Sequence, residues 1–255
     1  MNMFSKEPRC RYGQPQLAEV ICQLRFPEIL TIQTNAPADF QEAIRDQFPL
    51  YLRRQELPVS AVSGNKEPVI NHQFATADGL WRVNLTSKFI SLTCGSYSCW
   101  EDFAAHLDKP LVAFLQIYTP APFERIGLRY LNFISRNQLG LEETPFSELI
   151  RPCYLGLLSQ EDVTESAVSR STVDYEAAIR GGCRVKLHAG PGKVKRGVKE
   201  DPEIKFIFDQ DLYMNGPVQH NLVPGALQTL HSQADSIFRG AITQKLHEAM
   251  EPETI

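Results

Sequence analysis

The sequence predicts an α+β fold, in which tandem β-α-β-β-β-α repeats form a continuous curved antiparallel sheet with helices on one face. The first observation is an internal repeat: the Leu-Arg-Phe string at 24–26 is followed by Phe40–Arg45, and the Leu-Arg-Tyr string at 128–130 by Phe146–Arg151. The two copies lie about one hundred residues apart, which indicates a duplication. The second observation is that strand-like runs of alternating residues accompany a helical pattern in each half. Joining the open edges of two such units gives one longer sheet.

The repeat divides the chain into an N-terminal arm at 1–16, a first half at 17–122 and a second half at 123–255. Together the halves are expected to form one pseudo-symmetric globular unit. At 255 residues the chain is long enough to bury about three quarters of the surface that it exposes when unfolded. The 43% apolar and 22% charged residues exclude a disordered or fibrous class. No apolar run approaches the ~20 residues of a membrane helix.

Strand and helix signals follow one another through the first half. Residues 19–33 are rich in apolar and β-branched types, which predicts a strand pair or one long bent strand interrupted at Pro27. A helix is predicted at 35–48, because a capping Asn and a Pro precede apolar residues at helical spacing. Further strand segments are expected at 51–57, 69–75, 81–85 and 89–93, with tight turns between the last ones.

The first half ends in a second predicted helix. Ser98–Glu101 has the S-x-x-E form of a capping box, and Phe103 and Leu107 continue one apolar face. Pro110 should kink or restart this helix, because proline lacks the N–H group that a helix interior needs.

The second half follows the same plan. A strand is predicted at 125–135, and Thr144-Pro145 again places a capping residue before the first helical position of a helix at 146–150. Three strands are expected next, at 165–179, 183–188 and 203–212. The last element, at 226–250, carries an apolar stripe typical of a long amphipathic helix.

Three strings carry a resemblance to known proteins: Glu19–Pro27, Ser96–Phe103 and Arg125–Asn132. Together they resemble an uncharacterised, sporadically distributed bacterial family of about 250 residues. The resemblance implies a stand-alone prokaryotic protein of an accessory, phage-defence or toxin-antitoxin type, and it assigns no catalytic residue. The order of elements is also similar to the duplicated saddle of the TATA-box-binding-protein fold, an analogy of fold that transfers no function.

Charge and cysteine content narrow the function classes. The formal net charge of −4 argues against a general nucleic-acid coat, because non-specific binding needs an excess of Lys and Arg. The six cysteines are scattered singly with no C-x-x-C pair, which favours reduced thiols in a reducing compartment. The first residues include Lys6, Arg9 and Arg11 with no apolar stretch behind them. We therefore expect a cytoplasmic protein with no membrane partner.

Arg25 and Arg129 hold matching positions in the repeated strand, and side-chain alternation places each on the face opposite its apolar neighbours. Near a pseudo-twofold axis the two guanidinium groups would grip a phosphate, a carboxylate or an acidic partner side chain. The alternative is that each arginine forms a cross-strand ion pair. The carboxylates available for such pairs are Glu176, Asp209 and Asp211.

A second candidate is a basic segment around Ala189–Gly192, which has turn chemistry and is predicted to be a loop. Its basic residues are Lys186, His188, Lys193, Lys195, Arg196 and Lys199. A mobile basic loop would follow a nucleic-acid backbone or cover a phosphorylated ligand, whereas the alternative is a solvated hairpin tip. The segment is not a Walker loop, since Val194 replaces the hydroxyl residue that binds magnesium.

Catalytic and metal-binding patterns find little support, and no cofactor is expected. Cys183 and His188 stand five positions apart in a predicted strand, so alternation sends them to opposite faces. His231 and Asp235 share a helix face, but Asp235 is expected to pair with Arg239. The other candidates are expected to be structural: Cys94 and Cys99 as packed thiols, and Trp81, Tyr97, Trp100 and Tyr118 as core or sheet-edge aromatics.

The sequence therefore favours a non-enzymatic binding or regulatory protein that engages an anionic partner through its sheet and basic segment. The partner would be nucleic acid, a nucleotide or an acidic protein surface. One alternative is a protein-protein module, such as an antitoxin-like inhibitor or an assembly subunit, whose partner comes from a neighbouring gene. Another is an enzyme acting on a nucleotide or small molecule between the repeats. An oligomer is compatible with each of these.

Overall fold

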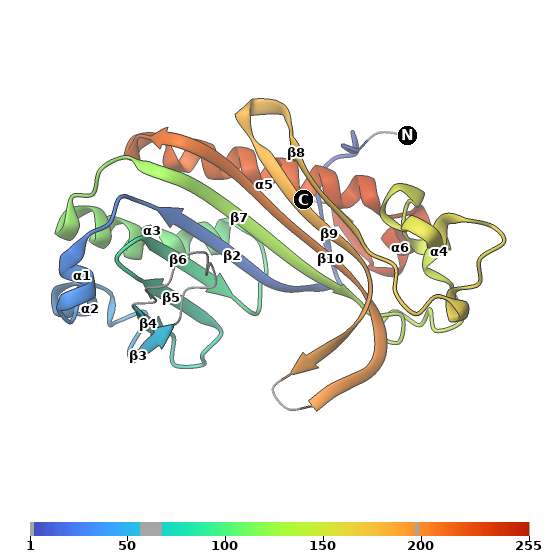
Figure 1. Cartoon of the computed structure of the whole chain (residues 1–255), viewed down its shortest axis with the longest axis horizontal. Coiled ribbons are helices and arrows are strands. Elements are labelled where there is room, and N and C mark those ends of the chain that lie inside the picture. The colour runs from blue at the N-terminus through green and yellow to red at the C-terminus, as the bar shows by residue number, and fades with distance from the viewer. Residues whose placement is uncertain (1–2, 57–67, 197–198, 255) are drawn as a thin grey trace. The chain divides into compact units, whose positions relative to one another are not determined.

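The computed structural model describes residues 3–56, 68–196 and 199–254 (Figure 1). It is an α+β protein with a large antiparallel sheet of nine strands, in the order β3-β4-β5-β6-β2-β7-β10-β9-β8, and a small sheet of β1 and β11. Contacts group the chain into two units. Unit 1 is Met1–Ala18, Arg129–Tyr213 and Gln228–Ile255, and unit 2 is Glu19–Leu128 and Met214–Leu227.

Unit 2 contains a run of strands and three helices. Their bounds are β2 (Leu17–Arg25), α1 (Leu30–Thr34), α2 (Ala38–Ile44), β3 (Leu50–Glu56), β4 (Val69–Ala75), β5 (Trp81–Leu85), β6 (Phe89–Cys94) and α3 (Trp100–Tyr118). The four strands predicted between 51 and 93 are confirmed within a residue or two. In β5 and β6 apolar residues alternate with polar ones, and Asp78-Gly79 forms the turn between β4 and β5.

One face of the unit 2 strands is apolar and is covered by α3. Neighbouring buried pairs such as Cys22 and Leu92 lie opposite each other in the ladder. Helix α3 adds aromatic contacts, with the Phe103 ring centroid 5.7 Å from that of Trp81 and the His106 ring stacked on Trp81 at 3.9 Å. Burial of these rings against the strands stabilises the unit.

Unit 1 contains the remaining elements. Their bounds are β1 (Cys10–Tyr12), β7 (Phe123–Ile134), α4 (Phe146–Leu149), β8 (Val173–Ala178), β9 (Arg184–Arg196), β10 (Lys199–Val218), α5 (Val223–Ala241), α6 (Gln244–Ala249) and β11 (Pro252–Thr254). The first residues of β7, the last of β10 and the start of α5 belong to unit 2. Short 3-10 segments of unit 1 lie at Pro152–Tyr154, Gly156–Ser159, Glu165–Ala167 and Arg180–Gly182, and one at His220–Leu222 belongs to unit 2.

Helix α5 packs on one face of the unit 1 strands. The Tyr130 hydroxyl of β7 lies 2.7 Å from Nδ1 of His231, and the Gln210 amide of β10 donates to the Ala234 carbonyl at 3.2 Å. Phe208 meets Phe238 edge to face. Since side chains alternate along a strand, the residues between these, such as Arg129 and Asp209, lie on the opposite face.

Several predicted elements differ from the structure. Residues 19–33 are not one bent strand, because β2 ends at Arg25 and Leu30–Thr34 forms a short helix. The predicted capping box is wrong, since the N-cap of α3 is Cys99 and the Ser98 hydroxyl donates to the Asp102 carboxylate instead. Helix α3 continues through Pro110 without a restart.

In the second half, the strand predicted at 165–179 is shorter. It begins at Val173, after a 3-10 segment at Glu165–Ala167. The long helix predicted at 226–250 is two helices, because Ile242 leaves the helix to bridge Ile150. The N-terminal arm contains β1, which pairs with β11.

The predicted halves also differ in strand content. Within the described residues, β2 is followed by four strands before α3, whereas β7 is followed by three before α5. The tandem repeat and the placement of all helices on one face stay predictions. None of the helices in the described part of the chain has the length and apolar character needed to cross a membrane.

Candidate functional site

Arg25 and Arg129 belong to different units of the structure. Arg25 lies exposed at the end of β2 in unit 2, opposite Phe89 of β6. Arg129 lies on β7 in unit 1, where Nε is 2.7 Å from Oδ1 of Asp209 and Nη2 is 2.5 Å from Oδ2. This bidentate geometry confirms the alternative prediction, a cross-strand ion pair, for Arg129. The pairing of the two arginines across an axis stays a prediction.

The basic segment is a strand and not a loop, which corrects the sequence interpretation. Ala189–Gly192 lies inside β9 and pairs with β10. In this ladder Ala189 lies opposite Phe208, and Gly192 lies opposite Lys205. The β8 ladder ends at Ala189, so Pro191 stands where β9 has one neighbour, the place where a strand tolerates proline. Position 190 requires glycine, because the Cβ of any other residue would collide with the Ser171 carbonyl oxygen.

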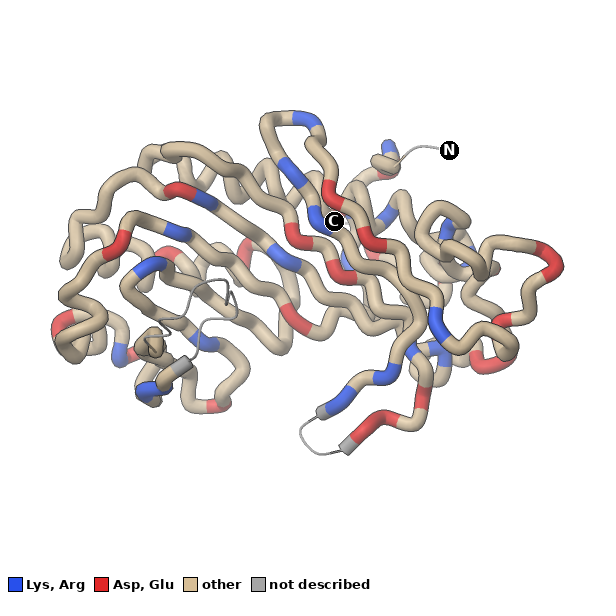
Figure 2. Tube along the Cα trace, in the orientation of Figure 1, with Lys and Arg blue, Asp and Glu red and all other residues tan. Residues whose placement is uncertain are grey.

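The solvent-facing side of the unit 1 strands carries charges in cross-strand rows. We call this surface the charged face; it consists of Arg129, Asp174, Glu176, Arg184, Lys186, His188, Asp209, Asp211 and Tyr213. Figure 2 shows that basic positions on β9 lie between acidic positions on β10 and β8. The rows arise because each of these strands places every second side chain on the same face.

The ladder register defines two of the rows. His188 of β9 stands between Asp209 of β10 and Asp174 of β8, and its Nδ1 lies 2.7 Å from Oδ1 of Asp174. Lys186 stands between Asp211 and Glu176, with its Nζ 3.6 Å from Oε2 of Glu176. In both rows the group on the central strand is flanked by two carboxylates.

A third cluster centres on Glu176. Its Oε1 accepts hydrogen bonds from the Tyr213 hydroxyl and from Arg184, whose Nη2 lies 3.2 Å away. The Tyr213 hydrogen bond, assisted by Arg184 and Lys186, holds the pKa of Glu176 below its usual range. Glu176 is therefore ionised at neutral pH.

The charged face is hollowed into a depression of about 520 Å³, and its walls carry both signs of charge. It brings together three predicted site residues, Arg129, Lys186 and His188, with carboxylates. Asp209 and Glu176 were expected only as ion-pair partners, and Asp174 was missed. The alternation along Val173–Ala178, with every second residue exposed, is the signal that would have found it.

The other predicted basic residues lie on a ribbon where β9 and β10 extend past the end of β8 (Figure 1). Lys193 Nζ lies 2.9 Å and Lys195 Nζ 3.7 Å from the carboxylate of Glu200. The hydrogen bond and charge of Lys193, together with a hydrogen bond from Lys195, lower the pKa of Glu200. The side chains of Arg196 and Lys199 lie outside the described part of the structure, although their backbones pair in the ladder.

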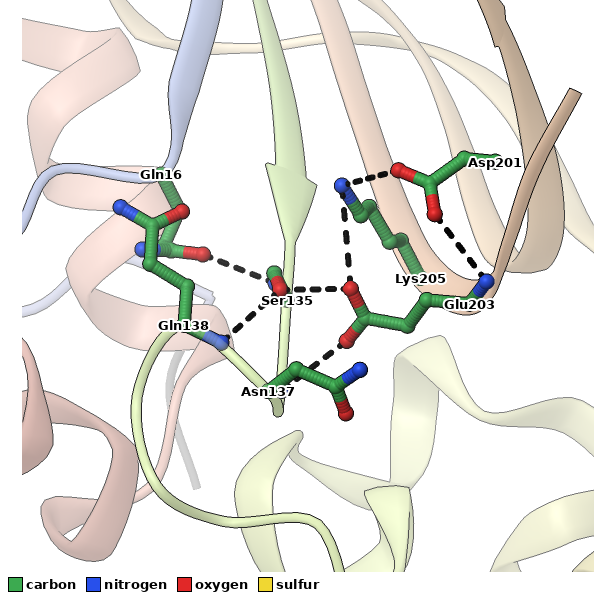
Figure 3. A network of polar contacts seen from close by, with 7 residues as sticks. All are labelled: Gln16, Ser135, Asn137, Gln138, Asp201, Glu203 and Lys205. Carbon is green, nitrogen blue, oxygen red and sulfur yellow. Dashed lines mark hydrogen bonds and ion pairs between the residues drawn. The ribbon is translucent and has the colours of Figure 1, made fainter. Parts of the chain in front are cut away.

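A network of polar contacts around the buried residue Ser135 fixes the base of this ribbon (Figure 3). The Ser135 hydroxyl donates to Glu203 at 2.6 Å and accepts from the Gln138 N–H at 3.1 Å. Glu203 also accepts from the Asn137 N–H at 3.0 Å and faces Lys205 at 3.7 Å. The β9–β10 register shifts between Glu200 and Ile204, so the network holds the strand where the ladder is irregular.

The residues weighed for catalysis do not converge. Cys183 is buried beside the Gln233 amide, whereas His188 lies on the charged face against Asp174. His231 contacts Tyr130, and burial raises the pKa of Asp235. No three His, Cys, Asp or Glu side chains gather in a metal-binding arrangement within residues 3–56, 68–196 and 199–254.

The cysteine and aromatic candidates of unit 2 are packed. Burial raises the pKa of the Cys94 thiol to about 11, which disfavours the reactive thiolate. Trp81 and Trp100 are each 7% exposed and contact Phe103. These observations agree with the structural interpretation of Cys94, Trp81 and Trp100.

Comparison of the sequence with protein-family models gives no match, and no curated protein matches it either.

Proposed function

We propose that the protein is a non-enzymatic binding protein and that its charged face receives a protein partner whose surface carries both signs of charge. The observation that supports this most is the matching of charges on the face itself. Arg129, Lys186 and His188 each lie within 4 Å of a carboxylate. A purely anionic ligand would meet these carboxylates as well as the cations.

The strength of these pairs suits recognition. The side chains of Lys186 and Glu176 are 58% and 40% exposed, and exposed ion pairs contribute only about 0–1 kcal/mol each. A partner can therefore replace the Lys186–Glu176 pair with its own pairs at little free-energy cost. Complementary charges of this kind speed association and select the partner.

An anionic partner, the first function expected from the sequence, has its best support on the ribbon. There Lys193 and Lys195 share the single carboxylate of Glu200, and the Lys195 side chain is 71% exposed. The surplus positive charge favours contact with a phosphate backbone or an acidic surface. A role in a prokaryotic accessory or defence system is part of the same proposal and rests on the family resemblance.

The experiment is native purification from the source cells with matched variants. The double variant Arg129→Glu with Lys186→Glu inverts two cations of the charged face, and Arg45→Glu with Lys245→Glu inverts two exposed cations elsewhere. We expect the wild type and the second variant to retain the same bound protein, identified by mass spectrometry, and the first to lose it. Equal retention by both variants would contradict the proposal.

The same preparation separates the anionic alternative. If the partner is nucleic acid, the absorbance ratio shows it, and Lys193→Ala with Lys195→Ala should release it and flatten the salt dependence of binding. A protein partner that survives this ribbon variant but not the charged-face variant supports the first proposal over the second.

A further inference from the structure

A second depression, of about 500 Å³, lies in unit 1 at a place that no predicted site residue occupies. Three segments line it: Ser5 of the N-terminal arm, Arg180 and Gly181 of the turn between β8 and β9, and Thr229, Ser232 and Gln233 of α5. No Asp or Glu is among the described residues that line it. Its chemistry therefore differs from that of the charged face, where carboxylates balance the cations.

Arg180 supplies the charge. Its guanidinium carbon lies 4.0 Å from the centroid of the Phe4 ring, an arrangement in which the planar group stacks on the aromatic face. No carboxylate of the described chain pairs with it. A stacked guanidinium keeps its N–H groups at its edge, where they donate in pairs to an oxyanion.

Gln233 supplies a second recognition element. Its side chain is 7% exposed, and Nε2 donates to the Arg180 carbonyl at 3.0 Å and to Sγ of Cys183 at 3.1 Å. The Arg180 carbonyl only accepts, so the amide orientation is fixed with the nitrogen on that side. Its oxygen, Oε1, has no hydrogen-bond partner within the described part of the chain. A buried acceptor without a donor destabilises the fold, so a bound donor is favoured there.

The turn makes room for a ligand at this point. Gly181 has φ +71°, and a Cβ on it would lie 3.4 Å from Nε2 of Gln233 and 3.5 Å from Cγ2 of Thr229. Glycine thus provides the left-handed backbone and keeps the space beside Gln233 clear of a side chain. Backbone and hydroxyl groups complete the lining.

We propose that this depression binds a small hydroxylated oxyanion, such as a sugar phosphate or a sugar acid. The anionic group pairs with Arg180, and a hydroxyl of the ligand donates to Oε1 of Gln233. The volume suits a molecule of monosaccharide size. The proposal is independent of the charged face, since the two depressions share no lining residue.

Isothermal titration calorimetry tests it with four probes: D-ribose 5-phosphate, D-gluconate, D-ribose and inorganic phosphate. We expect saturable one-to-one binding of at least one of the first two, tighter than that of ribose or phosphate alone. The tighter of the two identifies phosphate or carboxylate as the preferred oxyanion. Arg180→Ala should weaken this binding at least tenfold, and Arg180→Lys should weaken it less.

Two further variants separate recognition from folding. Arg170→Ala removes another exposed arginine of unit 1 and should leave the dissociation constant unchanged. Gln233→Met keeps the length of the side chain and removes the acceptor, so it should weaken the hydroxylated probe but not phosphate. Arg180 is exposed, and its variants are expected to fold with an unchanged circular dichroism spectrum. Absence of saturable binding at millimolar probe, or equal affinity of the wild type and Arg180→Ala, would overturn the proposal.

Discussion

Replacing Ser135 by alanine tests how the base of the β9–β10 ribbon is held. Ser135 is 4% exposed, and its hydroxyl makes a 2.6 Å bond to the Glu203 carboxylate and a 3.1 Å bond from the Gln138 N–H. A hydrogen bond to a charged group is worth about 1.5–3 kcal/mol and a neutral one about 0.5–1.5 kcal/mol. Glu203 keeps its bond to Asn137 and the charge of Lys205, so we expect a loss of about 2–3 kcal/mol in the free energy of unfolding.

Urea unfolding measures this loss, provided that the slope of free energy against denaturant stays constant. Ser159→Ala is the matched control, because its hydroxyl donates to the Gly156 carbonyl and accepts from the Gln160 amide in an exposed turn, with no charged partner. We expect the control to change stability by about 0.5 kcal/mol or less. If Ser135→Ala lost no more stability than the Ser159→Ala control, the assignment of a stabilising network would be refuted.

Three further predictions concern buried groups. Burial lowers the pKa of His72 below the 6.5 of the unfolded chain, so the folded state favours neutral histidine. The stability of the wild type should therefore fall as the pH drops below about 6.5, and the stability of His72→Gln should fall less. Parallel stability profiles of the two proteins against pH would contradict this. Burial raises the pKa of Asp235, so Asp235→Asn should increase stability at pH 7. This gain should vanish as the pH falls to 3.8, the pKa of the carboxyl in the unfolded chain. A loss of stability at pH 7 would contradict the prediction. In the native protein, the exposed Cys153 should react with a thiol reagent before the buried Cys22, because burial raises the pKa of the Cys22 thiol to about 12. Equal reaction rates of the two thiols would be inconsistent with the structure.

Local patterns predicted much of the fold where sequence and tertiary packing agree. Strands β5 and β6 follow directly from residue alternation and turn residues. The position of Arg129 on the face opposite its apolar neighbours follows from the same alternation. Leu30–Thr34 was assigned to a strand because of its β-branched Thr31 and Ile32. It is helical because Ile32 is buried at 1% exposure on that turn, so packing outweighs a propensity difference of a few tenths of a kcal/mol.

The candidate site was only partly predictable, because pairing partners come from distant strands. Gly190 and Pro191 indicate a turn when read locally, yet the ladder with β10 makes them part of β9. Asp174 becomes a site residue only through its register with His188, which depends on the position of β8 beside β9. Charge composition could not show that Lys186, His188, Lys193 and Lys195 of the basic segment already have carboxylate partners.

Hydrogen–deuterium exchange of the protein with and without its co-purified partner tests the central claim most directly. If the charged face receives the partner, amide protection should increase in Val173–Ala178 and in the first part of β9, which carry the exposed charges of the face. The ribbon and the strands of unit 2 should change little. Unchanged exchange in β8 and β9, with new protection elsewhere, would contradict the assignment of the charged face as the binding surface.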